Sequence, residues 1–211
     1  MKKSLEQLVE GFRRFREQHF AKDDALYRQL ATQGQTPKVM VVACCDSRVD
    51  PAIVLGSAPG DLFVIRNVAN LVPPADNHAG YHGTTAALEY GVRFLGVKHI
   101  IVFGHAQCGG IQALMRHIDV NDPDSFIGDW MELAEPARAA VERDLPDAAP
   151  EVRARACEQN AIGVSLQNLM TFHWVRERVE SGQLALHGWY FDIEQGQLLQ
   201  YNNTSRQFEN L

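Results

Sequence analysis

The amino-acid sequence predicts an α/β protein with a mostly parallel central sheet flanked by helices. Three short runs, 38–44, 61–66 and 99–104, are rich in apolar and β-branched residues and have the composition of buried strands. Stretches with helical spacing precede the first run, separate the second from the third, and follow the third. Because strands that alternate with helices are typical of parallel sheets joined by crossovers, this order of elements predicts the fold class.

The helices are predicted from the period of their apolar residues. In 4–31 apolar side chains recur at steps of three and four, with charges between them. Residues 83–95 show a helical pattern, and Gly96 stands where a C-terminal cap is expected. The remaining expected elements are helices from about Gly110 and within 125–142 and 151–180, and a hairpin of strands at 184–193 and 198–201.

Composition narrows the class of protein. Apolar residues make up 45% of the 211 residues and charged residues 22%, which is the balance of a folded globular protein. Twenty Lys and Arg face 26 Asp and Glu, so the net charge is −6, the opposite sign to most proteins that bind nucleic acid or anionic lipid. The longest apolar run, 39–45, is far shorter than the ~20 residues of a membrane span. We therefore expect neither a nucleic-acid partner nor a membrane.

The four cysteines indicate a reducing compartment. Cys44 and Cys45 are adjacent, which suits no simple disulfide framework, and a chain of this length folds without such crosslinks. The N-terminal residues carry charges at short intervals and lack a secretory apolar core. These features predict a cytoplasmic protein whose thiols are free to bind a metal or to react.

Metal-binding residue types follow two of the predicted strands where each strand ends. Residues 44–48 read C-C-D-S-R, and residues 105–110 read H-A-Q-C-G-G. Sites in open parallel sheets form beyond the carboxyl ends of the strands, so both motifs are expected at one edge. Zinc takes thiolate and imidazole ligands, and a catalytic zinc keeps one open position. The motifs therefore predict one Zn²⁺ per chain, bound by Cys44, His105 and Cys108.

Asp46 and Arg48 are expected to act as a pair beside this metal. While the chain stays extended, Cys44, Asp46 and Arg48 share one side, and Cys45 is expected to pack away as a core residue. A charge-assisted pair holds Asp46 near the metal without letting it bind. A closed zinc site, with Asp46 as the fourth ligand, is the inactive alternative.

Both motifs in this context resemble the β class of carbonic anhydrases, over about 34–115. The segments 65–70 and 87–90 also resemble that family. The resemblance implies reversible hydration of carbon dioxide to bicarbonate and a proton, a lyase reaction, by attack of zinc-bound hydroxide. In this reaction we expect Asp46 to accept a hydrogen bond from the nucleophile, and Arg48 to keep Asp46 ionised and off the metal.

The substrate pocket resembles that of the plant-like members of the family. The residues that this resemblance implies for substrate binding are Gln35, Phe63, Val68, Tyr90 and Gly109, the last through its backbone N–H. A second pattern in the family has an additional anion site built from Trp, Arg and Tyr. The matching positions here are Val41, Arg66 and Phe191, so only the arginine is present and this regulatory site is not expected.

The expected organisation is one domain spanning 1–211. It comprises an N-terminal helical arm at 1–33, a zinc-binding core at 34–120, and helices with C-terminal strands at 121–211. The apolar stripe of the arm, together with the resemblance, predicts that the arm packs on a partner subunit. A homodimer or a dimer-based tetramer is therefore expected.

Three other functions compete with this interpretation. An enzyme of the same fold could hydrolyse carbon disulfide or carbonyl sulfide, although Gln35 and Tyr90 favour the anhydrase. A non-catalytic protein could use a closed zinc site for stability or assembly. A thiol redox protein would need Cys44 and Cys45, but adjacent cysteines strain a disulfide and the chain has no C-x-x-C motif.

Overall fold

The computed structural model describes residues 3–20, 25–76, 82–116 and 125–211. The chain forms two compact units, Met1–Thr36 and Pro37–Leu211, and the second contains the whole sheet. The boundary that we expected at 120/121 lies outside the described residues.

The first unit consists of two helices, α1 (Leu5–His19) and α2 (Ala25–Gln33). Ser4 begins α1 with a capping box, in which its hydroxyl accepts the N–H of Gln7 and its own N–H bonds the Gln7 side chain. The single helix predicted across 4–31 is therefore wrong, since α1 ends at His19; residues 21–24 lie outside the described part.

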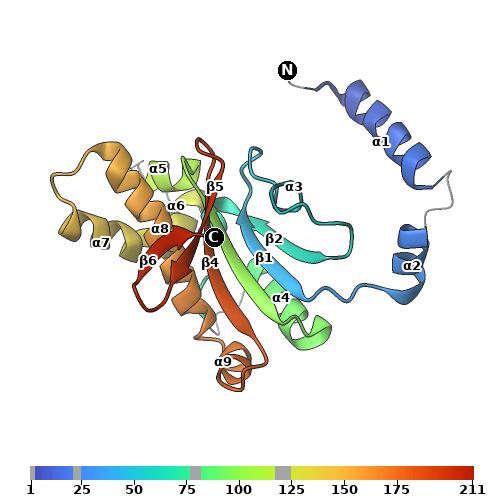
Figure 1. The fold of residues 1–211 in the computed structure, drawn as a ribbon. Coiled ribbons are helices and arrows are strands. Elements are labelled where there is room, and N and C mark those ends of the chain that lie inside the picture. Colours follow the sequence, from blue (N-terminus) through green and yellow to red (C-terminus); the bar gives the residue numbers. More distant parts are fainter. Residues whose placement is uncertain (1–2, 21–24, 77–81, 117–124) are drawn as a thin grey trace. The chain divides into compact units, whose positions relative to one another are not determined.

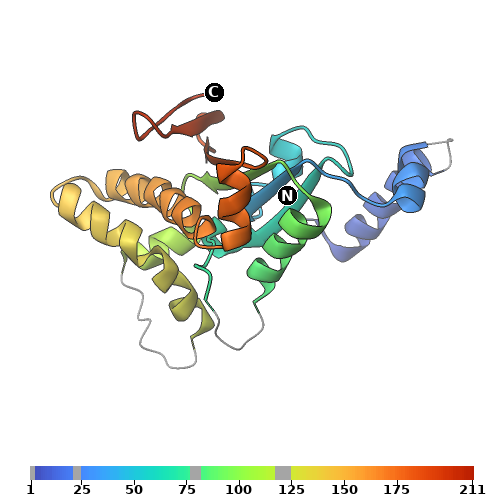
Figure 2. The same cartoon turned by 90° about the horizontal axis from the view of Figure 1, so that it is seen from below.

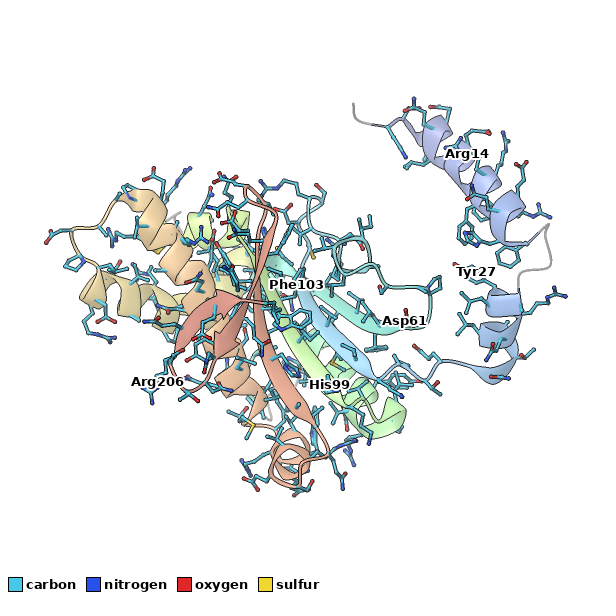
Figure 3. The ribbon with its side chains drawn as sticks, viewed as in Figure 1. Arg14, Tyr27, Asp61, His99, Phe103 and Arg206 are labelled. Carbon is cyan, nitrogen blue, oxygen red and sulfur yellow. The ribbon has the colours of Figure 1, made fainter. Side chains whose placement is uncertain are left out.

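The apolar face of α1 is exposed in this unit. Leu5, Leu8 and Phe12 retain 73%, 56% and 62% of their accessible surface, and the described residues of α1 and α2 include no buried side chain. Tyr27 of α2, which is labelled in Figure 3, packs edge-on against Phe15 of α1. This unit thus has aromatic contacts but lacks a core of its own within the described residues.

The second unit is built on a six-stranded sheet in the order β2-β1-β3-β4-β5-β6 (Figure 1). The strands β2, β1, β3 and β4 are parallel to one another. At one edge of the sheet, β5 pairs antiparallel with β4, and β6 pairs antiparallel with β5. This arrangement confirms the predicted fold class, with one strand, β6, that we did not predict. The strands are β1 (Val39–Cys44), β2 (Leu62–Asn67), β3 (His99–His105), β4 (Ala185–Asp192), β5 (Gln197–Asn202) and β6 (Gln207–Asn210).

Helices connect and cover these strands. The stretch expected at 125–142 forms two α-helices with a short 3-10 helix, η3 (Glu132–Ala134), between them. The stretch expected at 151–180 also divides, because the chain turns at 170–172. The stretch at 83–95 is helical and ends with a π-helical turn, η2 (Tyr90–Leu95), before Gly96 at φ 68°. The α-helices of this unit are α3 (Pro51–Val54), α4 (Gly83–Glu89), α5 (Gly109–Met115), α6 (Phe126–Met131), α7 (Glu135–Asp144), α8 (Pro150–Leu169) and α9 (His173–Glu180).

The core lies on both faces of the sheet. On one face Met40 and Val42 of β1 and Val102 of β3 pack with residues of α4, α8 and α9. Figure 2 shows the ribbons of these helices against the sheet. On the other face Val41 and Phe103 form a smaller cluster with side chains from α3. Because β1 and β3 are covered on both faces, their sequences are continuous apolar runs rather than alternating ones.

Candidate metal centre

Two neighbouring strands bring the predicted metal ligands together. Cys44 is the last residue of β1 and His105 the last residue of β3, the strand that runs from His99 through Phe103 (Figure 3). Cys108 lies three residues after His105, directly before the first residue of α5. The ligand atoms of the two cysteines and the histidine lie within 4.8 Å of one another, and all three residues are buried.

The hydrogen bonds of His105 leave one ring nitrogen directed to a metal. Nδ1 lies 2.8 Å from the carbonyl oxygen of Ala106, so this nitrogen donates and Nε2 carries the free lone pair. Nε2 is buried and has no hydrogen-bond partner among the residues that the structure describes. Such an orphaned atom beside two thiols is costly unless a metal occupies the site. One nitrogen and two sulfur donors fit Zn²⁺.

The two thiols are close enough to share a proton. Cys44 Sγ and Cys108 Sγ are 3.9 Å apart. The hydrogen bond from Cys108 lowers the pKa of the Cys44 thiol, and the same contact, together with burial, raises the pKa of Cys108. A metal bound there replaces the shared proton, because zinc takes cysteine as thiolate.

Asp46 is held beside this ligand group by Arg48. The guanidinium donates from Nε to Oδ1 at 3.0 Å and from Nη2 to Oδ2 at 2.7 Å, a bidentate pair. The side-chain hydrogen bonds from Arg48 hold the pKa of the Asp46 carboxyl well below its usual range. Oδ2 lies 3.9 Å from Nε2 of His105. The carboxylate is thus ionised, next to the metal position and paired with Arg48.

A turn brings Asp46 and Arg48 together, and it also corrects one expectation. The N–H of Arg48 donates to Oδ1 of Asp46, and the N–H of Val49 donates to the Asp46 carbonyl, so the chain turns between Asp46 and Val49. Cys45 lies just before this turn and beyond the last residue of β1. It is exposed, and the prediction that it packs away is wrong.

Arg66 of β2 donates hydrogen bonds to the backbone of residues 44–49. Its Nη2 donates to the carbonyl oxygens of Asp46 and Val49, and its Nε donates to the carbonyl of Cys44 at 3.0 Å. Nη1 forms an ion pair with Asp50. Arg66, the one residue of the additional anion-site pattern that this chain retains, is thus hydrogen-bonded to the backbone around Cys44.

Sequence reasoning missed two residues that contact Arg48 or its neighbours. Nη2 of Arg48 donates to the carbonyl oxygen of Gln107 at 2.9 Å, and the Gln107 side chain donates to Glu194. Gln107 has a φ of 58°, an unusual value for a residue other than glycine. Its place inside the H-x-x-C motif was the only sequence signal, whereas no signal pointed to Glu194.

The predicted substrate residues do not all meet in one chain. Val68 lies close to the chain that follows Cys108, because a Cβ on Gly110 would be 2.7 Å from Val68 Cγ1. Phe63 pairs with Met40, four residues before Cys44, and so lies about 13 Å along the sheet from the metal end. The Tyr90 ring packs against the Phe63 ring, with 6.1 Å between the two ring centroids.

The other two predicted substrate residues differ in location. Gly109 is exposed at the start of α5, directly after the ligand Cys108, so its backbone lies at the metal loop. Gln35 belongs to the other unit, Met1–Thr36. Only Val68 and Gly109 are therefore placed beside the metal ligands of the same chain.

The fold and the site define a class of protein. A buried set of two thiols and one imidazole at the carboxyl end of a parallel sheet, with an arginine-held carboxylate beside it, has the donors of the metal centre of a zinc enzyme. No helix among the described residues is both long and apolar enough to cross a membrane.

Comparison with known proteins identifies the family. The sequence model described as "Carbonic anhydrase" matches residues 39–198. Beta carbonic anhydrase 3 of Arabidopsis thaliana is 40% identical over 195 residues, 92% of this chain and 75% of that protein. The chloroplastic beta carbonic anhydrase 5 of the same plant is 40% identical over 90% of this chain, which spans 62% of that relative.

Solved structures agree with the sequence matches. The beta-carbonic anhydrase CcaA superposes with a TM-score of 0.91 at 34% identity, covering 98% of this chain and 92% of that one. A tetrameric beta-carbonic anhydrase from Sordaria macrospora gives a TM-score of 0.74 at 30% identity, over 92% of each chain. The chain belongs to the β-carbonic anhydrase family, whose enzymes use zinc to hydrate carbon dioxide.

Proposed function

We propose that Cys44, His105 and Cys108 hold the zinc ion with which this enzyme converts carbon dioxide and water to bicarbonate and a proton. The observation that carries the proposal is the buried, unpartnered Nε2 of His105 between two thiols, with the Asp46 carboxylate 3.9 Å away. Zinc bound there lowers the pKa of a coordinated water and so supplies a nucleophile close to neutral pH.

The chain's own residues orient the reactants. Asp46 is ionised and accepts a hydrogen bond from the attacking water, which directs an oxygen lone pair to the carbon. Arg48 keeps both carboxylate oxygens engaged, so that Asp46 stays off the fourth ligand position. Val68 offers carbon dioxide an apolar wall, and the N–H of Gly109 is a donor for one of its oxygens.

A second copy of the chain completes the substrate pocket. Phe63 and Tyr90 lie together at the other end of the sheet from their own metal ligands, and Tyr90 is 46% exposed. In a homodimer or a dimer-based tetramer, Gln35, Phe63 and Tyr90 of one subunit face the metal centre of the next. The exposed apolar face of α1 packs on that partner, which supports such an assembly energetically.

The compartment is proposed from the thiols. All four cysteines are free in the structure, two of them at the metal centre and one of them exposed. Free thiols of this kind persist in a reducing environment. We therefore assign the enzyme to the cytoplasm, a proposal that measuring its distribution in fractionated cells would test.

Stopped-flow hydration of carbon dioxide by zinc-quantified protein tests the function, from about pH 6.5 to 9. We expect one zinc per chain and a rate that rises with pH, as a zinc enzyme with a titrating water requires. The variant Cys44→Ser, which removes one thiolate ligand, serves as the control and should lose both zinc and rate. A solvent-level rate across this range with one zinc per chain would contradict the proposal and indicate a closed site.

The same preparation distinguishes the related chemistry. Hydrolysis of carbon disulfide and of carbonyl sulfide is measured in parallel with hydration. The proposal predicts that the specificity constant for carbon dioxide exceeds both by far. A higher specificity constant for carbon disulfide or carbonyl sulfide would mean that the enzyme hydrolyses these substrates instead, with the same zinc ligands.

A further inference from the structure

A buried carboxylate lies directly beneath the metal-binding loop and has no part in the proposed reaction. Glu158 of α8 is only 4% exposed. Its Oε1 accepts the backbone N–H of Cys108 at 2.9 Å, and its Oε2 accepts the hydroxyl of Tyr190 at 2.7 Å. Both carboxylate oxygens are therefore used, one by a metal ligand and one by a side chain of β4.

Tyr190 is itself held in place. Its side chain is fully buried in the core, and the guanidinium of Arg155 lies 5.3 Å from the centre of its ring. Arg155 in turn donates to Asp192 at 2.8 Å. The hydroxyl that bonds Glu158 thus sits on a ring fixed by packing and by a neighbouring cation.

A carboxylate buried in this position lowers the stability of the folded protein. Burial raises the pKa of Glu158, although the hydrogen bonds from Tyr190 and from Cys108 oppose that shift. Apolar residues of similar volume usually stabilise a core at least as well as a buried polar network does. An explanation in terms of packing alone is therefore insufficient, and the contact with Cys108 suggests another.

Cys108 needs an external hydrogen-bond acceptor for its N–H. It precedes α5 as the N-cap residue, so its N–H lies outside the hydrogen-bond ladder of the helix, and the residue at N3, Ile111, has no side-chain acceptor for it. Directly before it, Gln107 has a positive φ of 58°, a backbone conformation that residues other than glycine rarely adopt. An acceptor that fixes this peptide also fixes the direction in which the Cys108 side chain leaves the backbone.

We propose that Glu158, oriented by Tyr190, is a positioning residue of the metal centre. By accepting the Cys108 N–H, it presets Sγ of Cys108 toward Cys44 and His105 before metal binds. The inference rests on the zinc site of the proposed function, but it does not depend on the reaction that the site catalyses. It predicts that metal affinity responds to Glu158 more than the stability of the metal-free fold does.

Zinc affinity, measured by competition with a chromophoric chelator, tests this role. For Glu158→Ala we expect the zinc dissociation constant to rise roughly 10- to 100-fold, as for other residues that orient metal ligands. Glu158→Gln retains an acceptor for the Cys108 N–H, so its constant should stay within about threefold of the unmodified protein. Tyr190→Phe removes the hydroxyl that orients the carboxylate and should give an intermediate rise.

A matched control separates positioning from general destabilisation. Asn168 lies on the same helix and donates to the carbonyl of Val72, away from Cys108. Asn168→Ala should lower the melting temperature of the metal-free protein without changing zinc affinity. The proposal is overturned if Tyr190→Phe and Glu158→Ala leave zinc affinity unchanged, or if Asn168→Ala weakens it equally.

Two further results keep the test decisive. If Glu158→Ala does not fold, Tyr190→Phe and Glu158→Gln still give the predicted order of affinities, and any other order contradicts the proposal. The competition assay reads the metal centre directly, so a protein that binds zinc tightly but does not hydrate carbon dioxide would contradict the proposed function and leave this inference standing.

Discussion

The position of one carboxylate depends on Arg48. In the structure both oxygens of Asp46 are paired with this guanidinium, and Oδ2 is 3.9 Å from the metal-facing nitrogen of His105. An Asp46 without this partner would be free to bind the metal, because carboxylate is itself a zinc ligand. We therefore propose that Arg48 keeps the site open by holding Asp46 away from the metal.

Replacing Arg48 by alanine is therefore expected to stop the reaction while keeping the metal. We predict one zinc per chain in Arg48→Ala and a hydration rate lowered at least ~10- to 100-fold, the usual effect of losing a group that orients a metal site. Metal analysis and stopped-flow hydration measure the two quantities. Arg143→Ala, which breaks an exposed pair with Asp144, is the matched control. A fully active Arg48→Ala enzyme would refute the switch.

Cys45 gives a chemical test of the turn after β1. It is the exposed cysteine, whereas Cys44, Cys108 and Cys157 are buried, and burial raises the pKa of Cys157 to about 12. We predict that the zinc-loaded native protein reacts quickly with one equivalent of a thiol reagent per chain, because only an accessible thiolate reacts. Cys45→Ser should abolish this reaction and leave zinc content and hydration unchanged. Two or more fast equivalents would contradict the packing described.

At the scale of elements, α8 lies so close to the sheet that side chains are excluded beneath it. A Cβ on Gly104 of β3 would be 2.7 and 2.9 Å from atoms of Ile162, and one on Gly188 of β4 would be 2.8 Å from the same side chain. Gly163, the next residue of α8, has nothing within 4 Å of such a Cβ. Two glycines therefore permit the contact, and a third is dispensable.

Alanine substitutions at these glycines should have opposite effects. Gly104→Ala forces Ile162 aside, and we expect it to lower the free energy of unfolding by about 1–3 kcal/mol. Gly163→Ala should raise it by about 0.5–1 kcal/mol, since alanine loses less backbone entropy than glycine in a helix. Denaturant unfolding of both variants at one zinc concentration measures the difference. Equal effects of the two substitutions would show that the close approach of α8 is not maintained.

For the whole molecule, the exposed apolar face of α1 predicts assembly. Leu8 and Phe12 are one helical turn apart and are both more than half exposed. The double variant Leu8→Glu/Phe12→Glu should raise the subunit dissociation constant by at least ~10-fold, because it places two charges in an apolar interface. Sedimentation velocity measures the change, with Arg14→Ala on the same helix as control. An unchanged oligomer would show that this face packs elsewhere.

Metal binding should also stabilise the whole fold. The residues of the metal centre come from β1, β3 and the start of α5, so the unfolded chain lacks the site. Zinc at about 100 times its dissociation constant is expected to add about 2.7 kcal/mol. For a domain of this size that raises the melting temperature by roughly 5–10 °C. A calorimetric scan with and without chelator measures the shift, and Cys44→Ser should show none.

The sequence alone determined the fold class, the family and which three residues form the candidate metal centre. Hydrophobic runs predicted β1, β2 and β3, and the residues after β1 and β3 predicted the metal centre, because parallel strands place their carboxyl ends together. These features are local patterns, so they can be read without knowing which distant residues meet.

Only the tertiary structure decided what depends on contacts between distant residues. The chain at Cys45 and Asp46 is hydrogen-bonded to Arg66 and Asn67 of another strand, and the support of Cys108 comes from Glu158, fifty residues further along the chain. The helix expected across 4–31 ends at His19, and the position of Phe63 separates it from its own metal ligands. Such contacts carry no periodic signal, because side chains that meet through folding need not recur at any spacing in the sequence.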